Sequence, residues 1–238
     1  MSTTTPKSYF WRGIRDSLPF VLVAGPFGML FGVLATEAGL NLIQTMTFTV
    51  TVFAGAAQFT ALQLMQEHSP TLIVLVSALA VNLRVAMYSA ALTPYLGQAS
   101  LWQRALAAYF TVDQSYALSV VRFETDRNMV LSQRLRYFAG TVGLIAPVWY
   151  AASLTGAVMG AQIPDSWALD FALPITFLAM VAPMLRTPAH LAAALVAVLT
   201  ALLATGLPYN LGLLAAGFAG MATGARVEQI LDRRKSPA

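Results

Sequence analysis

Long runs of apolar residues, separated by charged or turn-forming residues, dominate the chain. An uncharged apolar run of about 18 residues or more can cross a bilayer as an α-helix. The pattern predicts eight membrane spans, at about residues 18–36, 42–65, 71–92, 105–121, 137–160, 167–185, 189–205 and 208–223.

The last two spans are the least distinct, because only Gly206, Leu207 and Pro208 separate them. A seven-span chain is therefore the alternative. The run from Ala189 to Thr223 is too long for a single helix at about 1.5 Å per residue, which favours two short spans or a hairpin.

Composition agrees with a membrane protein. The 238 residues are 58% hydrophobic and 10% charged, whereas a soluble domain has about 25% charged residues. The long runs lack the period-two alternation of a transmembrane barrel. The fold class predicted is all-α, a polytopic membrane helix bundle that forms a single membrane domain over residues 1–238.

Lysine and arginine predict the orientation, because they concentrate in cytoplasmic loops. With eight spans and a cytoplasmic N-terminus, every basic residue outside the spans except Arg104 lies on the cytoplasmic side. Residues 122–136 then form a cytoplasmic loop and the C-terminus is cytoplasmic as well. A seven-span model places the basic C-terminal tail outside, against the same rule. The chain is therefore predicted to be a multi-pass membrane protein.

The two halves of the chain share a faint similarity. Residues 32–35 followed by a span through Phe53–Gly55 resemble residues 156–159 followed by a span through Phe177–Ala179. Repeated halves are common in transporters, with the binding site between them. Two glycine-containing apolar segments also resemble each other by chance, and both readings stay open.

The first two spans carry candidate substrate-binding groups. Proline breaks helical hydrogen bonding, so Gly25 and Pro26 predict a kink or unwinding near Gly25, and unwound spans expose backbone groups to substrates. Gln58 follows a small-residue patch and offers an amide within the membrane. Close helix packing by small residues and an interhelical hydrogen bond are the respective structural alternatives.

Arg84 lies near the middle of the third span, close to Asn82 and Tyr88. A cation at that depth is costly unless it faces protein or water, so it marks a candidate site. Arg84 and Tyr88 share a helix face, whereas Asn82 points elsewhere. The guanidinium suits a substrate carboxylate. Its alternative role is an internal salt bridge.

Asp113, inside the fourth span, is the natural partner of Arg84. Burial favours the neutral carboxyl group and a nearby arginine favours the carboxylate, so a group balanced between the two can exchange protons near neutral pH. Asp113 is therefore the proton-relay candidate. A permanently ionised counter-ion to Arg84 is the alternative.

Little in the sequence suggests an enzyme. The chain has no cysteine and two histidines, His68 and His190, which lie far apart in sequence, so no metal site is predicted. It lacks the GxSxG, HExxH and GxxxxGK[ST] motifs, and no cofactor is expected. The basic residues follow membrane topology, so nucleic acid is not an expected partner.

Four elements resemble the AzlC family, which includes BrnF-like and YgaZ-like members. They are PFGMLFG from Pro26, FAGAAQF from Phe53, NLR from Asn82 with YSAAL from Tyr88, and Asp113-Gln114. The resemblance is strongest from Pro19 to Ser119.

The resemblance implies the large subunit of a two-component exporter in the bacterial inner membrane, which works with a small AzlD-type membrane subunit. The substrates implied are leucine, isoleucine, valine and often methionine. We therefore expect a secondary transporter that exports hydrophobic amino acids, driven by the proton gradient. A non-catalytic membrane subunit and a passive channel are the alternatives.

Overall fold

The computed structural model describes residues 6–160, 185, 187–207 and 211–235, and its regular elements there are all helical. They are α1 (Pro6–Ser17), η1 (Leu18–Phe20), α2 (Val21–Glu37), α3 (Leu42–Thr51), α4 (Gly55–Gln66), α5 (Thr71–Leu96), α6 (Leu101–Tyr109), α7 (Asp113–Thr125), α8 (Leu131–Gly160), α10 (Pro188–Leu203) and α11 (Leu211–Lys235). The chain divides into two compact units, and the single membrane domain that the sequence predicts stays a prediction. Unit 1 is Met1–Leu62 with Val81–Pro164, and unit 2 is Gln63–Ala80 with Asp165–Ala238.

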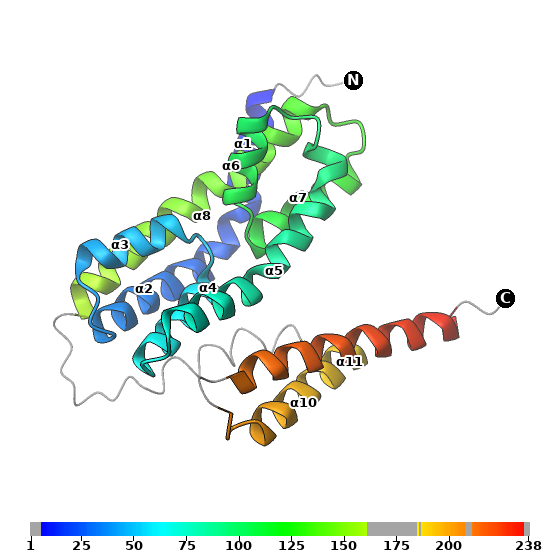
Figure 1. The fold of residues 1–238 in the computed structure, drawn as a ribbon. Helices are drawn as coiled ribbons and strands as arrows, with labels where there is room; N and C mark the ends of the chain where they lie inside the picture. The colour runs from blue at the N-terminus through cyan, green and yellow to red at the C-terminus, as the bar shows by residue number, and fades with distance from the viewer. Residues whose placement is uncertain (1–5, 161–184, 186, 208–210, 236–238) are drawn as a thin grey trace. The chain divides into compact units, whose positions relative to one another are not determined.

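Unit 1 is built on α1, α2 and α8, which pack together along their length (Figure 1). A methyl group at Gly140 would overlap the backbone of Phe10, and one at Gly156 would overlap the carbonyl of Met29. Residues later in α1–α2 contact residues later in α8, so α1–α2 and α8 run parallel. Glycines allow this backbone approach, as in other membrane helix pairs.

The fourth predicted span, 105–121, is not a single crossing helix. It divides into α6 and α7 at residues 110–112. Four residues connect α5 to α6, and the side chains of α5 and α6 line one shared cavity. α7 then returns, because Asp113 contacts Arg84 near the middle of α5 and Phe123 contacts Tyr95 near its end. α6 and α7 form a hairpin that enters unit 1 and leaves at the same end.

The second predicted span, 42–65, is also broken. α3 ends at Thr51 and α4 begins at Gly55. α3 runs antiparallel to α8, since it starts beside the end of α2 and reaches Ser153 through Thr49. The link 67–70 must join α4 to the start of the 26-residue α5. That link spans at most about 3.5 Å per residue, so α4 must end close to the start of α5. Because α5 begins on the side where α3 begins, α4 runs back toward that side.

The two hairpins repeat each other with opposite orientation. Each begins with a capping box, Asn41 with Gln44 in α3 and Ser100 with Gln103 in α6. Each breaks at a phenylalanine, Phe53 in one and Phe110 in the other. The repeated segments are therefore residues 42–66 and 101–125, which are separated in the chain by α5. A repeat of whole halves was one of two open readings of the sequence, and its segment Phe177–Ala179 lies outside the described residues.

The helix break predicted at Gly25 is absent. α2 passes through Gly25 and Pro26 as α-helix. The first span departs from α-helix earlier, at the short 3₁₀ segment η1, where Pro19 occupies the first turn. Proline at an early helical position loses little, because its missing amide hydrogen has no helical partner there.

Among the described residues, three helices are long and apolar enough to cross a membrane: Ser8–Glu37, Thr71–Leu96 and Leu131–Gly160. They correspond to the predicted spans at 18–36, 71–92 and 137–160. The predicted loop 122–136 contains the end of α7 and the start of α8, which leaves 126–130 as the link. The predicted span 167–185 lies outside the described residues except for Leu185.

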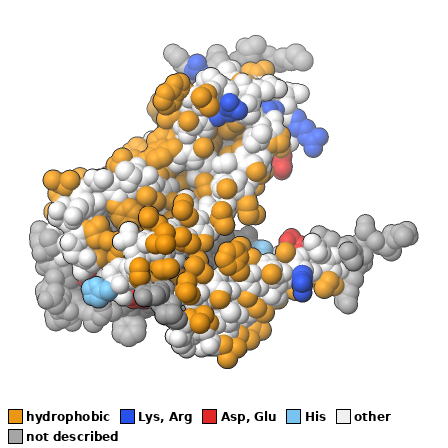
Figure 2. Space-filling model, viewed as in Figure 1, with side chains coloured by type: hydrophobic (Ala, Val, Ile, Leu, Met, Phe, Trp, Pro, Cys, Tyr) orange, Lys and Arg blue, Asp and Glu red, His pale blue; other side chains and the backbone are white. Residues whose placement is uncertain are grey.

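Basic side chains gather at the end of unit 1 where α1 and α8 begin, as Figure 2 shows. We call this the arginine end and define it by Arg12, Arg122, Arg127 and Arg134. The hairpin formed by α6 and α7 also starts there, beside the end of α5, so Arg104 belongs to this end. In the eight-span prediction, Arg104 is the one basic residue outside the spans that lies opposite the others. In the structure it lies at the same end as they do, in agreement with the preference of basic residues for one side of the membrane.

Helices α10 and α11 of unit 2 pack against each other as an antiparallel hairpin (Figure 1). Gly212 meets Ala204, and Gly220 meets Ala193 and Ala197. The sequence predicts these helices as spans 189–205 and 208–223 or as a hairpin. Pro188 begins α10, which is the helix position that proline favours.

We predict that Gly156→Ala destabilises the fold, because its methyl group would overlap the backbone of α2. Overpacking of this kind costs about 1–3 kcal/mol. Thermal unfolding of the purified protein in detergent measures the loss. Gly25→Ala is the matched control, since nothing lies within 4 Å of a methyl group there. Equal melting temperatures for the two variants would contradict the close packing of α2 on α8.

We also predict the sidedness of three single cysteines in this cysteine-free chain. Trp102→Cys at the start of α6 and Asn128→Cys in the 126–130 link should react with an impermeant thiol reagent from the same side. Ile43→Cys at the start of α3 should react from the other side. The eight-span prediction instead groups positions 43 and 102. Labelling in that pattern would refute the α6–α7 hairpin.

Candidate functional site

The tips of the two hairpins meet inside unit 1. The hydroxyl group of Tyr109, at the end of α6, donates to the carbonyl of Val50 near the end of α3. Tyr109 also shares a 3.0 Å hydrogen bond with Tyr150 of α8. The ring of Phe53 lies 5.6 Å from that of Phe110, in edge-to-face geometry. Two chain breaks that are distant in sequence therefore form one centre.

Two half-helices begin at this centre, α4 at Gly55 and α7 at Asp113. The first amide groups of a helix have no partner within it and carry partial positive charge. Broken membrane helices that start near the middle of the bilayer bind charged substrate groups in several transporter folds. Gly55 is needed here because a methyl group would lie 2.9 Å from the Trp149 indole.

Arg84, Tyr88 and Asp113 form a cluster at the start of α7. The guanidinium of Arg84 lies 3.1 Å from one carboxylate oxygen of Asp113. The hydroxyl group of Tyr88 donates to the other oxygen over 2.9 Å. The sequence predicts that Arg84 and Tyr88 share a face and that Asp113 is the partner of Arg84, and the structure brings the three together.

The side chain of Asp113 is held at both of its carboxylate oxygens. It receives two hydrogen-bonding groups, one of them cationic, and lies in the first turn of α7, where a negative charge is stabilised. The pair is nevertheless reachable, since the side chains of Arg84 and Asp113 are 30% and 37% exposed. An ion pair that is reachable in the middle of a membrane helix can exchange its partner for a ligand.

Tyr116 is a site residue that sequence reasoning missed. Its ring stacks on that of Tyr88, with centroids 4.2 Å apart and planes 11° apart. Tyr116 follows Asp113 by three residues and therefore shares its helix face. That spacing, next to an acid inside an apolar run, was a signal in the sequence.

Gln58 is fully buried in the first turns of α4, and neither atom of its side-chain amide has a hydrogen-bond partner among the described residues. Leaving a buried amide unpaired costs about 1–3 kcal/mol per group. Its neighbour Phe59 contacts the rings of Phe27 and Phe31. Gln58 therefore lies in an apolar cluster, with free hydrogen-bonding capacity close to the broken helix.

A buried polar network of α3 and α8 lies near the same break. The indole nitrogen of Trp149 donates to Thr49 over 2.9 Å, and Thr49 contacts the hydroxyl group of Ser153 at 3.5 Å. Thr49 and Ser153 are fully buried. Sequence reasoning did not find this network, because its members are about a hundred residues apart.

The other predicted site residues do not join the cluster. Gly25 and Pro26 lie within the continuous helix α2. Asn82 is half-buried on α5, and its side chain has no hydrogen bond to a described residue. No group of three or more acids or histidines suited to a metal ion occurs in the part of the chain that the structure describes.

We predict strong coupling between Arg84 and Asp113 in a double-mutant cycle. Arg84→Gln and Asp113→Asn each leave one charge unpaired. The double variant should therefore lose less free energy of unfolding than the sum of the losses in the two single variants. Groups in contact typically couple by about 0.5–3 kcal/mol. Glu124→Gln, about 16 Å further along α7, is the control and should add to Arg84→Gln. Additivity in both cycles would refute the pair.

Comparison with known proteins places this cluster in a family. The model of the AzlC protein family matches residues 19–163, which include both hairpins and the cluster. An uncharacterized membrane protein of Archaeoglobus fulgidus is 28% identical over 78% of this chain and 80% of its own. Inner membrane protein YgaZ of Escherichia coli is 25% identical over 75% and 76%. No solved structure matches the chain. The chain belongs to the AzlC family of membrane proteins.

Proposed function

We propose that this protein is a secondary transporter that exports branched-chain and related hydrophobic amino acids, coupled to the proton gradient. The observation that carries the proposal is the reachable Arg84–Asp113 pair at the point where two broken helices meet. Leucine, isoleucine and valine are the substrates proposed, with methionine as a further one. Family membership and the membrane relatives support membrane transport in general.

The pair matches the charges of a free amino acid. An amino acid that enters between the two side chains places its carboxylate on the guanidinium of Arg84 and its ammonium group on Asp113. The half-buried ring of Phe110, which packs on the buried ring of Phe53, offers an apolar surface for an aliphatic side chain. Gln58 has both amide atoms free for the same ligand.

Proton coupling follows from competition at Asp113. The carboxylate binds either an ammonium group or a proton, so each displaces the other. A proton that arrives from outside releases the amino acid there, and the protonated carrier then returns. Export driven by an inward proton gradient requires this exchange. If the substrate engaged Arg84 alone, the freed Asp113 would take up a proton together with the substrate, which opposes export.

The proposed orientation places the arginine end in the cytoplasm, by the distribution of basic residues. The bacterial inner membrane is the proposed location, and the E. coli relative, inner membrane protein YgaZ, supports it. A small AzlD-type membrane subunit is the proposed partner. The outward side chains of α5, among them Leu79, Leu83 and Met87, are exposed and apolar, as a bilayer or a membrane subunit requires.

The Arg84–Asp113 pair also favours a second function, a membrane subunit whose ion pair holds helices together without transport. A water-filled route distinguishes the two. Cysteine introduced at position 84 or 113 should react with aqueous thiol reagents in a transporter and resist them in a dry subunit. A passive channel would conduct amino acids without dependence on the proton gradient.

We predict that Asp113→Asn abolishes proton-driven export of labelled leucine from cells that express the chain with its small subunit. The asparagine amide neither binds a proton nor neutralises an ammonium group. Arg84→Lys should lower export by about tenfold, because it loses planar recognition of the carboxylate. Glu228→Gln, at an exposed position of α11, should export normally. Full proton-coupled export by Asp113→Asn would overturn the coupling role.

A further inference from the structure

The facing sides of α5 and α7 form a seam of paired side chains, because the two helices run in the same direction. The first layer is the Arg84–Asp113 pair, and the second is the stack of Tyr88 on Tyr116. Two helical turns on, about 10 Å further, the ring of Tyr95 lies 5.4 Å from that of Phe123. The seam leads from the central pair to the arginine end.

A buried hydroxyl group lies between the two aromatic layers. Ser119 shares a helix face with Tyr116 and Phe123. It is fully buried, and its hydroxyl group has no hydrogen-bond partner among the described residues. A buried polar group without a partner is uncommon in proteins and points to a ligand or water that is not part of the chain.

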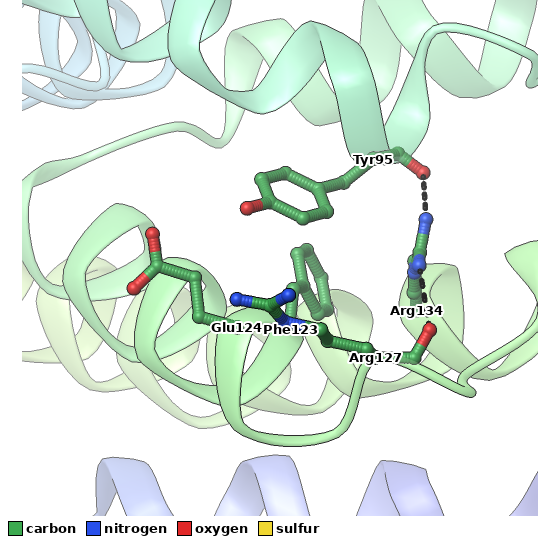
Figure 3. A pocket seen from close by; sticks show the side chains of 5 residues that line it. All are labelled: Tyr95, Phe123, Glu124, Arg127 and Arg134. Carbon is green, nitrogen blue, oxygen red and sulfur yellow. Dashed lines mark hydrogen bonds between the residues drawn. The ribbon is translucent and has the colours of Figure 1, made fainter.

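The seam opens at the arginine end into a cavity of about 520 Å³, lined by Tyr95, Phe123, Glu124, Arg127 and Arg134. Figure 3 shows the two rings between Arg134 and Glu124, with the side chain of Arg127 extending toward Glu124. The volume exceeds what one aliphatic amino acid needs. The cavity is also polar on its rim and aromatic at its base.

The two arginines of the cavity differ in the contacts that their side chains make. The guanidinium of Arg134 donates to the carbonyls of Tyr95 and Arg127, and it lies over both aromatic rings. Arg134 therefore fastens the ends of α5 and α7 together. Arg127 and Glu124 are exposed, and neither forms an ion pair with any described residue. They leave one cation and one anion free on the cavity wall.

We propose that this cavity is a second binding site for zwitterionic amino acids, on the cytoplasmic side of the Arg84–Asp113 pair. Arg127 binds the carboxylate, Glu124 binds the ammonium group, and the half-buried ring of Tyr95 accepts the aliphatic side chain, with the buried ring of Phe123 beneath it. The site repeats the charge pattern of the central pair at the other end of the same seam. The Tyr88–Tyr116 stack separates the two sites. This inference rests on the proposed export function.

The kinetics of export test the proposal. Glu124→Gln and Arg127→Gln should each raise the KM for cytoplasmic leucine by about fivefold, roughly the loss of one charge-assisted contact, and leave the maximal rate unchanged. The matched controls are Glu228→Gln and Arg226→Gln in α11, both exposed, with no change expected. If the wild-type chain exports no leucine, the proposed function fails. If it exports leucine and the KM of both cavity variants stays unchanged, the second site alone is refuted.

Occupancy is tested without transport by Asn128→Cys in purified protein, at an exposed position that adjoins Arg127 and makes none of the proposed contacts. Leucine should slow the reaction of this cysteine with a charged thiol reagent. Isoamylamine and 4-methylpentanoate, which each lack one charge of leucine, should protect at least fivefold less well. Glu228→Cys is the control and should react equally with and without leucine. Protection by phosphatidylethanolamine vesicles but not by leucine would assign the cavity to a lipid headgroup and overturn the proposal.

Discussion

Backbone groups freed at the two helix breaks must find partners inside the protein, because the bilayer core offers none. The rest of unit 1 depends on this constraint. The Tyr109 hydroxyl group accounts for one freed carbonyl, that of Val50, and its second contact to Tyr150 anchors the hairpin tips on α8. The tip of the α6–α7 hairpin therefore satisfies a backbone group of the α3–α4 hairpin and is itself tied to the α8 scaffold.

The scaffold of α1, α2 and α8 makes that meeting point rigid. Glycines along α2 and α8 bring the two backbones into contact, and such contacts resist sliding or rotation because no side chain can adapt. Trp149 of this scaffold packs against the first residue of α4 and bonds to α3. The break in the second hydrophobic run is thus held on both sides by one helix.

The proposed function depends on how unit 1 stabilises the charges of Arg84 and Asp113. A bare ion pair in hydrocarbon is costly, so Arg84 and Asp113 persist because a tyrosine and the start of α7 share the carboxylate. A half-helix that starts with an acid presents that acid at the centre of the unit. The same helix carries Phe123 and Glu124 to the arginine end, and one element therefore connects the middle of the protein to its rim.

The sequence by itself determined the membrane class, the family resemblance, the three long spans and the partnership of Arg84 with Asp113. These depend on local composition and on the cost of an unpaired charge, which any helical arrangement must meet. Only the tertiary structure decided that residues 42–65 and 105–121 are hairpins, since apolar runs have the same composition whether they cross or return. It also decided that α2 stays helical at Pro26, and that Tyr109, Tyr116 and Trp149 join the site. Those outcomes depend on contacts between residues far apart in the chain, which a one-dimensional pattern of apolar and polar positions does not contain.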